Sequence, residues 1–472
     1  MGAHMLFNQY YLECLSHASY LIGDETTGRA VVVDPQRDVA EYIADAEQAG
    51  MTIELVIETH FHADFLSGHL ELAEATGAKI VFSSVAEPEF DVMSVADGER
   101  YTLGPDGSNA VTLEFRHTPG HTPESMSIVV YEHADDIDAG TAPHGVLTGD
   151  TLFIGDVGRP DLLASIGFTR EELAEQLYTS LHTKLMTLPD ATKVFPAHGA
   201  GSACGKNLST ELVSTMGEQK ETNYALRAPD KDTFMALVTE GQPPAPSYFV
   251  YDAILNRKDR ELLDESAMPA ALSYDEVVAA PAGGAMLVDG RTPEEFAQGH
   301  LRQAVNVGLE GRYAEFAGSV IPSDTDIVLF VEPGFELEGK NRLARIGFDR
   351  VIGYLDQPYK VLFQHRDDVQ IASRLTAKAF DERRRTIDDL QIVDVRNPGE
   401  LADGKIDGAV EIPVGQLPGR VDELDVTRPT VVYCAGGYRS SVAASLLRQK
   451  GFVDVSDIIG GYGAWAEAVQ SA

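Results

Sequence analysis

An internal repeat in the second half of this chain limits its fold more than any other part of the sequence. The segment 289–305 recurs 105 residues later as 394–410, and eight of its positions match without a gap. A repeat this long indicates duplicated domains, because the units of a solenoid are much shorter. In each copy an apolar strand leads into the shared motif, and a second strand, a helix and a Gly-Phe turn follow. This alternation predicts two small α/β domains with parallel sheets.

The first 245 residues show none of this pattern. They contain short apolar strands and one helical segment, which we predict at residues 20–22, 30–33, 39–49 and 54–58. A Pro-rich stretch at 241–246 is typical of a linker. A chain of 472 residues, at ~150 residues per domain, suggests about three domains. We therefore predict a multidomain α/β protein, with domains at 5–245, 266–362 and 372–472.

The charge balance excludes one class of partner. Against 74 acidic residues the chain has only 37 basic ones, for a net charge of −37. So negative a chain repels phosphate backbones, and we expect no nucleic-acid partner. The acidity fits either an ordinary acidic bacterial protein or adaptation to salty surroundings. No apolar run approaches the ~20 residues that span a bilayer, so we expect no membrane association. Homo-oligomer formation is left open.

The cysteines indicate a reducing compartment. Cys14, Cys204 and Cys434 lie far apart in the sequence, which is no disulfide framework. We therefore expect a cytoplasmic protein whose thiols have separate roles. Cys14 lies in an apolar stretch, which indicates a packing role.

Histidines and aspartates gather at the ends of the predicted strands in the first domain. The candidate metal residues are His60, His62, Asp64, His121, Asp150 and His198. They stand beside glycines or prolines after apolar strands, where a rigid sheet can direct several side chains to one point. This pattern predicts a metal site and not a set of isolated surface or core histidines.

The order of these residues resembles the metallo-β-lactamase fold, whose signature is Thr-His-x-His-x-Asp-His followed by a distant His, Asp and His. The resemblance covers about residues 6–245 and implies an αββα sandwich with the metal at one sheet edge. Where hydrolases of the fold have the last histidine of the signature, this chain has Phe65. A second ion would keep only Asp64, His198 and a shared Asp150. Dizinc hydrolysis needs two ions about 3.5–4 Å apart, so a complete binuclear site is not expected.

Two histidines and one carboxylate remain, which is the donor set of non-haem Fe(II) oxygenases and leaves three coordination positions open. The chain resembles the persulfide dioxygenase branch of the superfamily. That resemblance implies one mononuclear Fe(II) per chain, held by His60, His121 and Asp150. It implies that neighbouring side chains orient the ligands and water, namely His62, Asp64 and His198.

Two further residues of this domain are candidates for handling substrate. Arg159 could fix a loop through Asp161 or clamp a substrate carboxylate, because a planar guanidinium suits either role. Cys204 lies six residues after His198 on a glycine-rich loop. It is either a buried small thiol or a catalytic thiol that accepts or guides a persulfide sulfur at the iron site.

The sequence around Cys434 predicts a strand, a tight loop and a helix. The loop N–H groups and the helix N-terminus would point at Sγ, and Arg439 would add positive charge. Such surroundings favour a sulfur anion and make Cys434 the candidate nucleophile. The loop residues that we expect to hold the substrate are Gly436, Gly437, Tyr438 and Ser440.

Residues 392–465 resemble rhodanese sulfurtransferases, with a Cys-x-x-x-x-Arg loop and a closing Gly-Gly-Tyr-Gly-Ala-Trp. Related dual-specificity phosphatases use a loop one residue longer, so this loop favours sulfur transfer. The middle copy has the acidic segment 332–338 where the cysteine loop should be, and acidic groups disfavour a sulfur anion. We predict that the middle copy is catalytically inactive and serves as a spacer or docking domain.

These resemblances imply a persulfide dioxygenase joined to a sulfurtransferase. The expected partners are a low-molecular-weight thiol persulfide, O2, sulfite and thiosulfate, and the direction of sulfur transfer stays open. Two other classes of protein remain possible interpretations. One is a dizinc hydrolase of the glyoxalase II kind that cleaves a glutathione thioester. The other is a non-catalytic sulfur carrier in which Cys434 relays persulfide to a partner.

Overall fold

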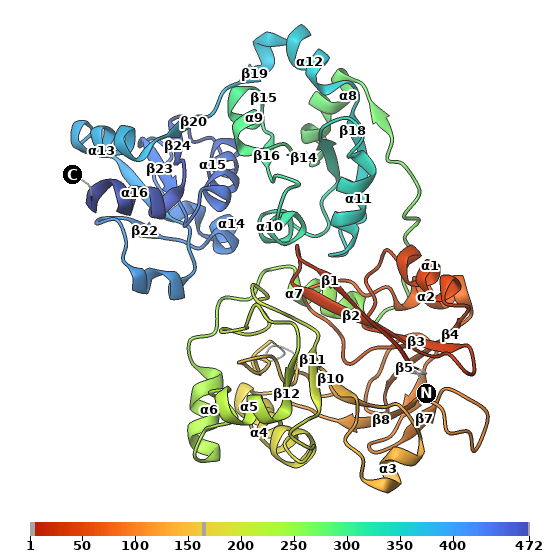
Figure 1. The fold of residues 1–472 in the computed structure, drawn as a ribbon. Helices are drawn as coiled ribbons and strands as arrows, with labels where there is room; N and C mark the ends of the chain where they lie inside the picture. Colours follow the sequence, from red (N-terminus) through yellow and green to blue (C-terminus); the bar gives the residue numbers. More distant parts are fainter. Residues whose placement is uncertain (1–4, 163–166, 471–472) are drawn as a thin grey trace. The chain divides into compact units, whose positions relative to one another are not determined.

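The computed structural model describes residues 5–162 and 167–470 and divides into two compact units (Figure 1). The first unit comprises Met1–Ala245 and Phe249–Leu263, and the second comprises Pro246–Tyr248 and Asp264–Ala472. The first unit thus takes in a segment that follows the Pro-rich stretch. Within residues 5–162 and 167–470, no helix has both the length and the apolar character needed to cross a bilayer.

The first unit is built on two six-stranded sheets. One has the order β1 (Met5–Leu12), β2 (His17–Asp24), β3 (Arg29–Val33), β4 (Thr52–Ile57), β5 (Lys79–Ser83) and β6 (Met93–Val95). The other has the order β12 (Ser214–Thr215), β11 (Lys193–Pro196), β10 (Gly145–Gly149), β9 (Met126–Tyr131), β8 (Thr112–His117) and β7 (Arg100–Thr102). In the first sheet β3 to β6 run parallel, and in the second only β10 and β11 do.

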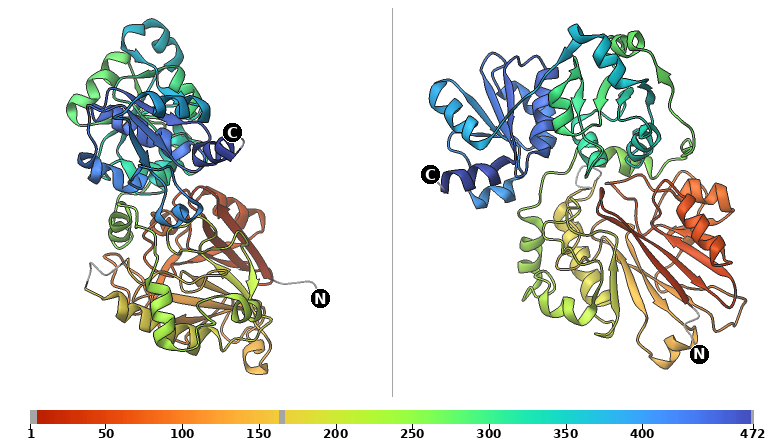
Figure 2. Two further views of the ribbon diagram at one scale, coloured as in Figure 1. Left: turned by 90° about the vertical axis from the view of Figure 1, so that its left-hand side faces the viewer. Right: turned by 45° about the horizontal axis from the view of Figure 1, so that its top comes forward.

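Helices cover the outer faces of both sheets. The first sheet packs against α1 (Ala40–Gln48) and α2 (His69–Thr76) through one apolar cluster. The second packs against α4 (Arg170–Ser180), α5 (Met216–Thr222) and α6 (Lys231–Thr239) through another. The unit also contains α3 (Asp135–Ala139) and α7 (Phe249–Leu255). Figure 2 shows this layering from two further sides, with red-to-orange helices over one sheet and yellow-green helices over the other.

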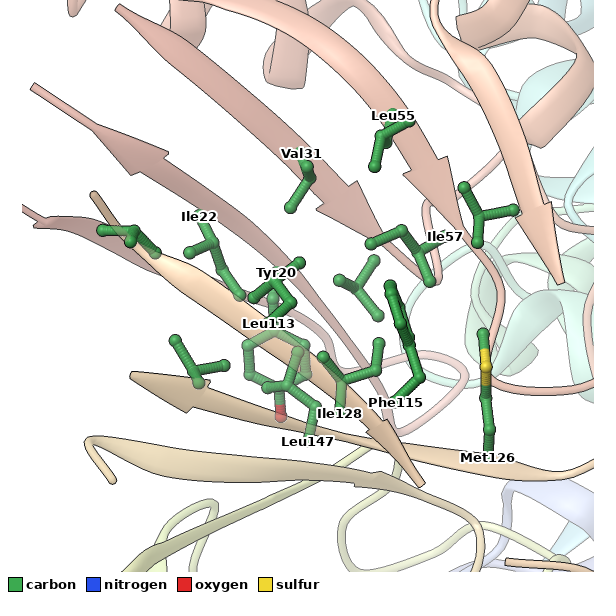
Figure 3. Close-up of a cluster of buried hydrophobic side chains, with 14 of the residues drawn as sticks. Tyr20, Ile22, Val31, Leu55, Ile57, Leu113, Phe115, Met126, Ile128 and Leu147 are labelled. Carbon is green, nitrogen blue, oxygen red and sulfur yellow. The ribbon is translucent and has the colours of Figure 1, made fainter. Parts of the chain in front are cut away.

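The core between the sheets consists of alternate strand residues that face inward. Tyr20 and Ile22 of β2 meet Leu113 and Phe115 of β8 there, with Val31, Ile57 and Ile128 close by (Figure 3). Side chains in a strand point alternately to opposite faces, so one face of each sheet forms this core and the other binds the helices. The predicted αββα sandwich is therefore confirmed, with α1 and the first strands within a few residues of their predicted positions.

The second unit contains two five-stranded sheets in which all strands are parallel. The first has the order β13 (Ala271–Leu272), β18 (Val351–Leu355), β17 (Ile327–Phe330), β14 (Met286–Asp289) and β16 (Val305–Asn306). The second has the order β20 (Ser373–Leu375), β24 (Val455–Ile458), β23 (Thr430–Tyr433), β21 (Gln391–Asp394) and β22 (Val410–Glu411). The predicted parallel sheets of the two repeats are confirmed.

Helices surround each of these sheets. Around the first lie α8 (Tyr274–Ala279), α9 (Pro293–Gln298), α10 (Tyr313–Val320), α11 (Glu336–Ala344) and α12 (Pro358–Gln364), with the two-stranded pair β15 (His300–Leu301) and β19 (Val369–Gln370). Around the second lie α13 (Ala377–Thr386), α14 (Leu417–Arg420), α15 (Tyr438–Gln449) and α16 (Gly461–Gln470).

The repeated motif has the same structural role in both copies. Asp289 and Arg291 form a buried ion pair of 2.6 Å, and the guanidinium also donates to the carbonyl of Gly299. Asp394 and Arg396 form the matching pair at 2.7 Å in the second copy. Buried charges need a partner of opposite sign, which explains why these residues recur together. The repeated Asp and Arg thus stabilise the fold of each copy by pairing with each other.

Candidate metal centre and cysteine loop

The predicted metal residues all lie just beyond the C-terminal ends of strands in the first unit. Three follow β4 in the irregular segment 58–68, one follows β8, one follows β10 and one follows β11: His60, His62, Asp64, His121, Asp150 and His198. All six are buried. Before Asp150, Gly149 has a φ of +50° and lies so close to Thr59 that a Cβ there would be 2.6 Å from its hydroxyl. A residue without a side chain is therefore needed where these two loops meet.

His60, His121 and Asp150 converge on one point. One donor atom from each lies within 4.8 Å of the other two. The carboxylate Oδ2 of Asp150 is 3.8 Å from Nε2 of His60 and 3.4 Å from Nε2 of His121. Ligands at about 2.0–2.2 Å from a shared ion lie roughly 3–3.6 Å from each other, so only small shifts would bring these atoms into one coordination sphere.

Hydrogen bonds fix which nitrogen of each imidazole faces this point. Nδ1 of His60 contacts the Thr59 hydroxyl at 3.0 Å, and Nδ1 of His121 donates to the carbonyl of Arg159 at 2.9 Å. Metal-binding histidines are commonly oriented in this way. Nε2 of His60 and both carboxylate oxygens of Asp150 are buried and have no hydrogen-bond partner among the described residues.

Burial also sets the protonation states at this point. It lowers the pKa of His60 well below the ordinary value and that of His121 to about 4, so both rings are neutral near pH 7. Burial raises the pKa of Asp150 to about 6. Buried polar atoms without partners are costly, and a cation would satisfy all of them at once. The donor set therefore fits a metal ion.

A second group of donors lies beside the first. Nε2 of His198 is 3.3 Å from Asp64 Oδ2 and 3.5 Å from Asp150 Oδ1. Asp150, His198 and Cys204 also bring donor atoms within 4.8 Å of one another. Burial, followed by the Asp64 and Asp150 carboxylates, raises the pKa of the Cys204 thiol well above its ordinary value. Cys204 thus reaches the metal residues as a protonated thiol.

Phe65 fills the space beside this second group. Its buried ring lies 4.3 Å from the ring of His62 and 3.9 Å from that of His17, measured between centroids. No imidazole is available at position 65, and the apolar ring excludes water there.

His62 belongs to two other groups of donors: it brings a donor atom within 4.8 Å of Asp64 and His198, and one within 4.8 Å of Asp34 and Glu58. Its Nε2 lies 3.1 Å from Oδ1 of Asp34 and 3.6 Å from Oε2 of Glu58. Burial lowers the pKa of His62, but these two carboxylates outweigh that effect and raise it to about 9. His62 thus links Asp64 and His198 to the carboxylates of Asp34 and Glu58.

Arg159 is fully engaged by the protein. Its guanidinium donates to both carboxylate oxygens of Asp161 and to the carbonyl of Ala203, and its backbone N–H donates to the carbonyl of Cys204. Since its own carbonyl accepts from His121, Arg159 joins His121 to the loop that carries Cys204. Of the two roles predicted for it, these contacts favour the fixing of a loop.

Three residues near the metal group did not stand out in the sequence. Asp34 accepts hydrogen bonds from the backbone and hydroxyl of Thr59, and it follows an apolar strand, so the same strand-end reasoning could have found it. His17 is buried against Phe65 and His198. Asn256 bonds to the segment after His60 from a distant part of the chain. No sequence pattern indicates either of these two.

Cys434 lies in the predicted cradle between β23 and α15. The N–H of Gly437 donates to Sγ at 3.0 Å, and Ser440 Oγ lies 3.6 Å from Sγ. Gly437 has a φ of +103°, and a Cβ there would lie 3.1 Å from the backbone nitrogen of Gly460. The sulfur is buried, whereas Gly436 in the loop is exposed.

Two other loop residues make contacts that the sequence did not predict. Arg439 forms two hydrogen bonds of 2.6 Å to the carboxylate of Glu400, so its charge is shared between that carboxylate and the sulfur. The hydroxyl of Tyr438 donates to the carbonyl of Gly308 in the preceding repeat at 2.6 Å. Tyr438 thus fastens the cysteine loop to the middle domain.

The middle repeat has a loop with similar backbone geometry at the matching position, but it lacks the cysteine and the arginine. Gly334 has a φ of +98°, close to that of Gly437. Val331, which is buried, follows β17 where Cys434 follows β23, and Glu336 stands where the second copy has Arg439. With no thiol and an acidic residue in place of the arginine, this loop cannot form or hold a persulfide anion.

Comparison with known proteins assigns both parts of the chain. The family model for the metallo-beta-lactamase superfamily matches residues 12–198, and the model for the rhodanese-like domain matches residues 273–361 and 376–468. Persulfide dioxygenase ETHE1, mitochondrial, of Homo sapiens is 30% identical over 227 residues, which cover 48% of this chain and 77% of that protein.

Two further relatives bear on the alternatives. Hydroxyacylglutathione hydrolase cytoplasmic of Arabidopsis thaliana is 34% identical over 191 residues, or 40% of this chain and 66% of that protein. The crystal structure of a metallo-beta-lactamase from Staphylococcus aureus subsp. aureus COL is 32% identical with a TM-score of 0.65, and the match covers 74% of this chain and 98% of that chain.

Proposed function

This chain belongs to the metallo-beta-lactamase superfamily, with persulfide dioxygenases among its relatives and two rhodanese-like domains after the sandwich, and from that premise we propose that it oxidises a thiol persulfide and transfers sulfane sulfur. The substrate is a low-molecular-weight persulfide, R–S–SH. The products are sulfite, free thiol and thiosulfate.

The observation that carries this proposal is the convergence of His60, His121 and Asp150, in which Nε2 of His60 and both carboxylate oxygens of Asp150 have no hydrogen-bond partner among the described residues. We propose that these three hold a single Fe(II). Two neutral imidazoles and one carboxylate are typical of non-haem iron oxygenases and leave positions open for two reactants. The apolar ring of Phe65, in place of a histidine, supports one catalytic ion over a binuclear pair.

The oxidation consumes R–S–SH, O2 and water and gives R–SH, sulfite and two protons. Bound Fe(II) supplies the one-electron chemistry that O2 requires. The protein residues supply geometry: Thr59 and the carbonyl of Arg159 hold the two imidazoles in the ligand tautomer, and Phe65 keeps water from the adjoining space. Cys204, held as a thiol between Asp64 and Asp150, is placed to guide the persulfide sulfur.

Sulfur transfer takes place at Cys434. Its thiolate attacks the outer sulfur of a second R–S–SH, so that R–SH leaves and a Cys434 persulfide anion forms. That anion gives its outer sulfur to sulfite, which regenerates the thiolate and forms thiosulfate. The N–H of Gly437 stabilises the sulfur anion, while Tyr438 and Ser440 keep the loop in place. Joining both activities in one chain raises the local concentration of sulfite at the second site.

We propose a cytoplasmic location from the state of the thiols. All three cysteines are free and buried, which supports a reducing, cytoplasmic location.

The test is a product balance. Iron-loaded protein with glutathione, coenzyme A or bacillithiol persulfide should consume one O2 for each sulfite formed. Added persulfide should convert sulfite into thiosulfate. The cleavage of thiosulfate by cyanide should depend on Cys434 and not on the metal site. Oxygen uptake without sulfite or thiosulfate would contradict the proposal.

A second candidate function is a dizinc hydrolase that acts on a glutathione thioester. Two observations favour it: the 34% identity to a hydroxyacylglutathione hydrolase, and the second donor group around His198, to which Cys204 adds a sulfur. Metal content separates the two candidates, because the hydrolase needs two zinc ions per chain.

A further inference from the structure

The segment Phe249–Leu263, named the strap below, follows the sandwich in sequence but packs within the first unit. The chain on either side of it belongs to the second unit. Tyr248 packs against Gly318 of α10, and the carbonyl of Asp264 accepts from Lys340 of α11. The strap is therefore a short segment that packs with the sandwich although the chain before and after it belongs to the second unit. Its contacts in the first unit indicate what it does there.

Asn256 makes the central contacts of the strap. Its side-chain Nδ2 donates to the carbonyls of His62 and Phe65, both at 2.8 Å, and its Oδ1 accepts from the N–H of Ser67 at 2.9 Å. The residue is 1% exposed. One amide thus satisfies three buried backbone groups in the segment that carries the metal residues.

Those backbone groups have few other ways to be satisfied. Residues 58–68 form neither helix nor strand, so their buried N–H and C=O groups must find partners elsewhere. Asp34 binds the N–H of Thr59 and Glu124 binds that of Phe61, which fixes the start of the segment. Asn256 fixes its second half, where Asp64 and Phe65 lie.

Other strap residues hold Asn256 in place. The guanidinium of Arg260 makes two hydrogen bonds to Glu71 and lies beside the carbonyl of Ser67. The guanidinium of Arg257 lies over the ring of Phe61, 4.6 Å from its centroid. The strap is therefore anchored on α2 and on the metal segment itself by residues that directly follow Asn256.

We propose that Asn256 is a positioning residue of the metal site: by clamping residues 62–67, it sets the placement of His62 and Asp64, which with His198 bring donor atoms within 4.8 Å of one another. The contact is not expected to touch substrate or the metal. It acts through the backbone of the metal segment, so its loss moves the donors without removing any of them.

The test uses the full chain and Co(II) as the probe, because the visible absorption of Co(II) reports its coordination geometry. Asn256→Ala should lower the affinity for Co(II) by about 10–100-fold, as loss of a ligand-orienting contact does, and should change the Co(II) spectrum. Asn256→Asp has almost the same volume but cannot donate to the two carbonyls, so it should weaken binding at least as much. Asn256→Ser, which keeps a hydroxyl donor, should recover part of the affinity.

Asn306→Ala is the matched control. Asn306 is buried in the second unit and also donates to two backbone carbonyls, those of Asp289 and Arg291. This variant should lose thermal stability and bind Co(II) as the wild type does. Equal Co(II) affinity and spectra for wild type and the folded Asn256→Asp variant would overturn the inference. Co(II) binding does not depend on the reaction that the protein catalyses. The positioning role of Asn256 can therefore be refuted while persulfide oxidation is confirmed, and persulfide oxidation can be refuted while the positioning role is confirmed.

Discussion

Replacing Glu71 by glutamine should destabilise the first unit strongly, because this carboxylate lies between two buried guanidinium groups. Its Oε1 is 2.9 Å from Nε of Arg37 and 2.6 Å from Nη1 of Arg260. The side chains of Arg37, Glu71 and Arg260 are 1%, 4% and 6% exposed. The backbone N–H of Leu263 also donates to Glu71. Glu71→Gln would remove the carboxylate that both buried guanidinium groups share.

The size of the effect follows from the pKa of Glu71. Burial raises it, but the two arginines outweigh burial and lower it from 4.5 to about 2. Each pKa unit corresponds to about 1.4 kcal/mol, so the interaction stabilises the fold by about 3 kcal/mol. Removal of one partner from a buried ion pair costs about 3–5 kcal/mol, which agrees. In a unit of this size the midpoint of thermal unfolding should fall by roughly 6–12 °C.

The pH dependence has a definite sign. A carboxyl group whose pKa is lower in the folded state stabilises the fold fully above its unfolded pKa of about 4.5. That stabilisation is lost as the pH falls toward 2. The difference between wild type and Glu71→Gln should therefore be full at pH 5–7 and under half as large at pH 3.

Differential scanning calorimetry of both proteins from pH 7 to pH 3 measures this difference for the transition of the first unit. Glu171→Gln is the control, because its pair with Arg170 is more than half exposed and surface pairs contribute little. A midpoint change below about 2 °C for Glu71→Gln at pH 7 would refute the reasoning. So would a difference that stays constant down to pH 3.

Three further predictions concern the two chemistries. Cys434→Ser should abolish thiosulfate cleavage by cyanide and leave O2 uptake intact. Loss of both activities would instead indicate a sulfur carrier in which Cys434 is needed for each of them. His121→Ala should remove a metal ligand and lower O2 uptake at least a hundredfold, with cyanide assays unchanged because Cys434 lies in the second unit. Gly437→Ala should lower sulfur transfer about tenfold or more, because the positive φ is strained with a Cβ, while Gly436→Ala, whose Cβ meets nothing within 4 Å, should stay near wild type.

The sequence was sufficient for the layers of the fold and for the order of the metal residues. Apolar strands ending in His or Asp predict where side chains converge, and His60, His121 and Asp150 do meet within 4.8 Å. The Asp-Arg motif of the repeat also predicted the duplicated parallel sheets. These features are visible because each depends on residues close together in the chain or on a repeated pattern.

The supporting contacts were not predictable in the same way. Asn256 lies 194 residues from His62. Its hydrogen bonds go to backbone groups, which every residue has, so the sequence shows no characteristic partner for it. The pairing of Arg439 with Glu400 likewise depends on how β21 and α15 meet. The orientation of His62 toward Asp34 was hidden because the motif gives the residue but not the direction of its ring.

Metal content combined with oxygen uptake tests the central claim most directly. Protein reconstituted anaerobically with Fe(II) and freed of excess metal should contain about one iron per chain and consume O2 only when a thiol persulfide is added. Two zinc ions per chain, with cleavage of a glutathione thioester and no persulfide-dependent O2 uptake, would contradict it.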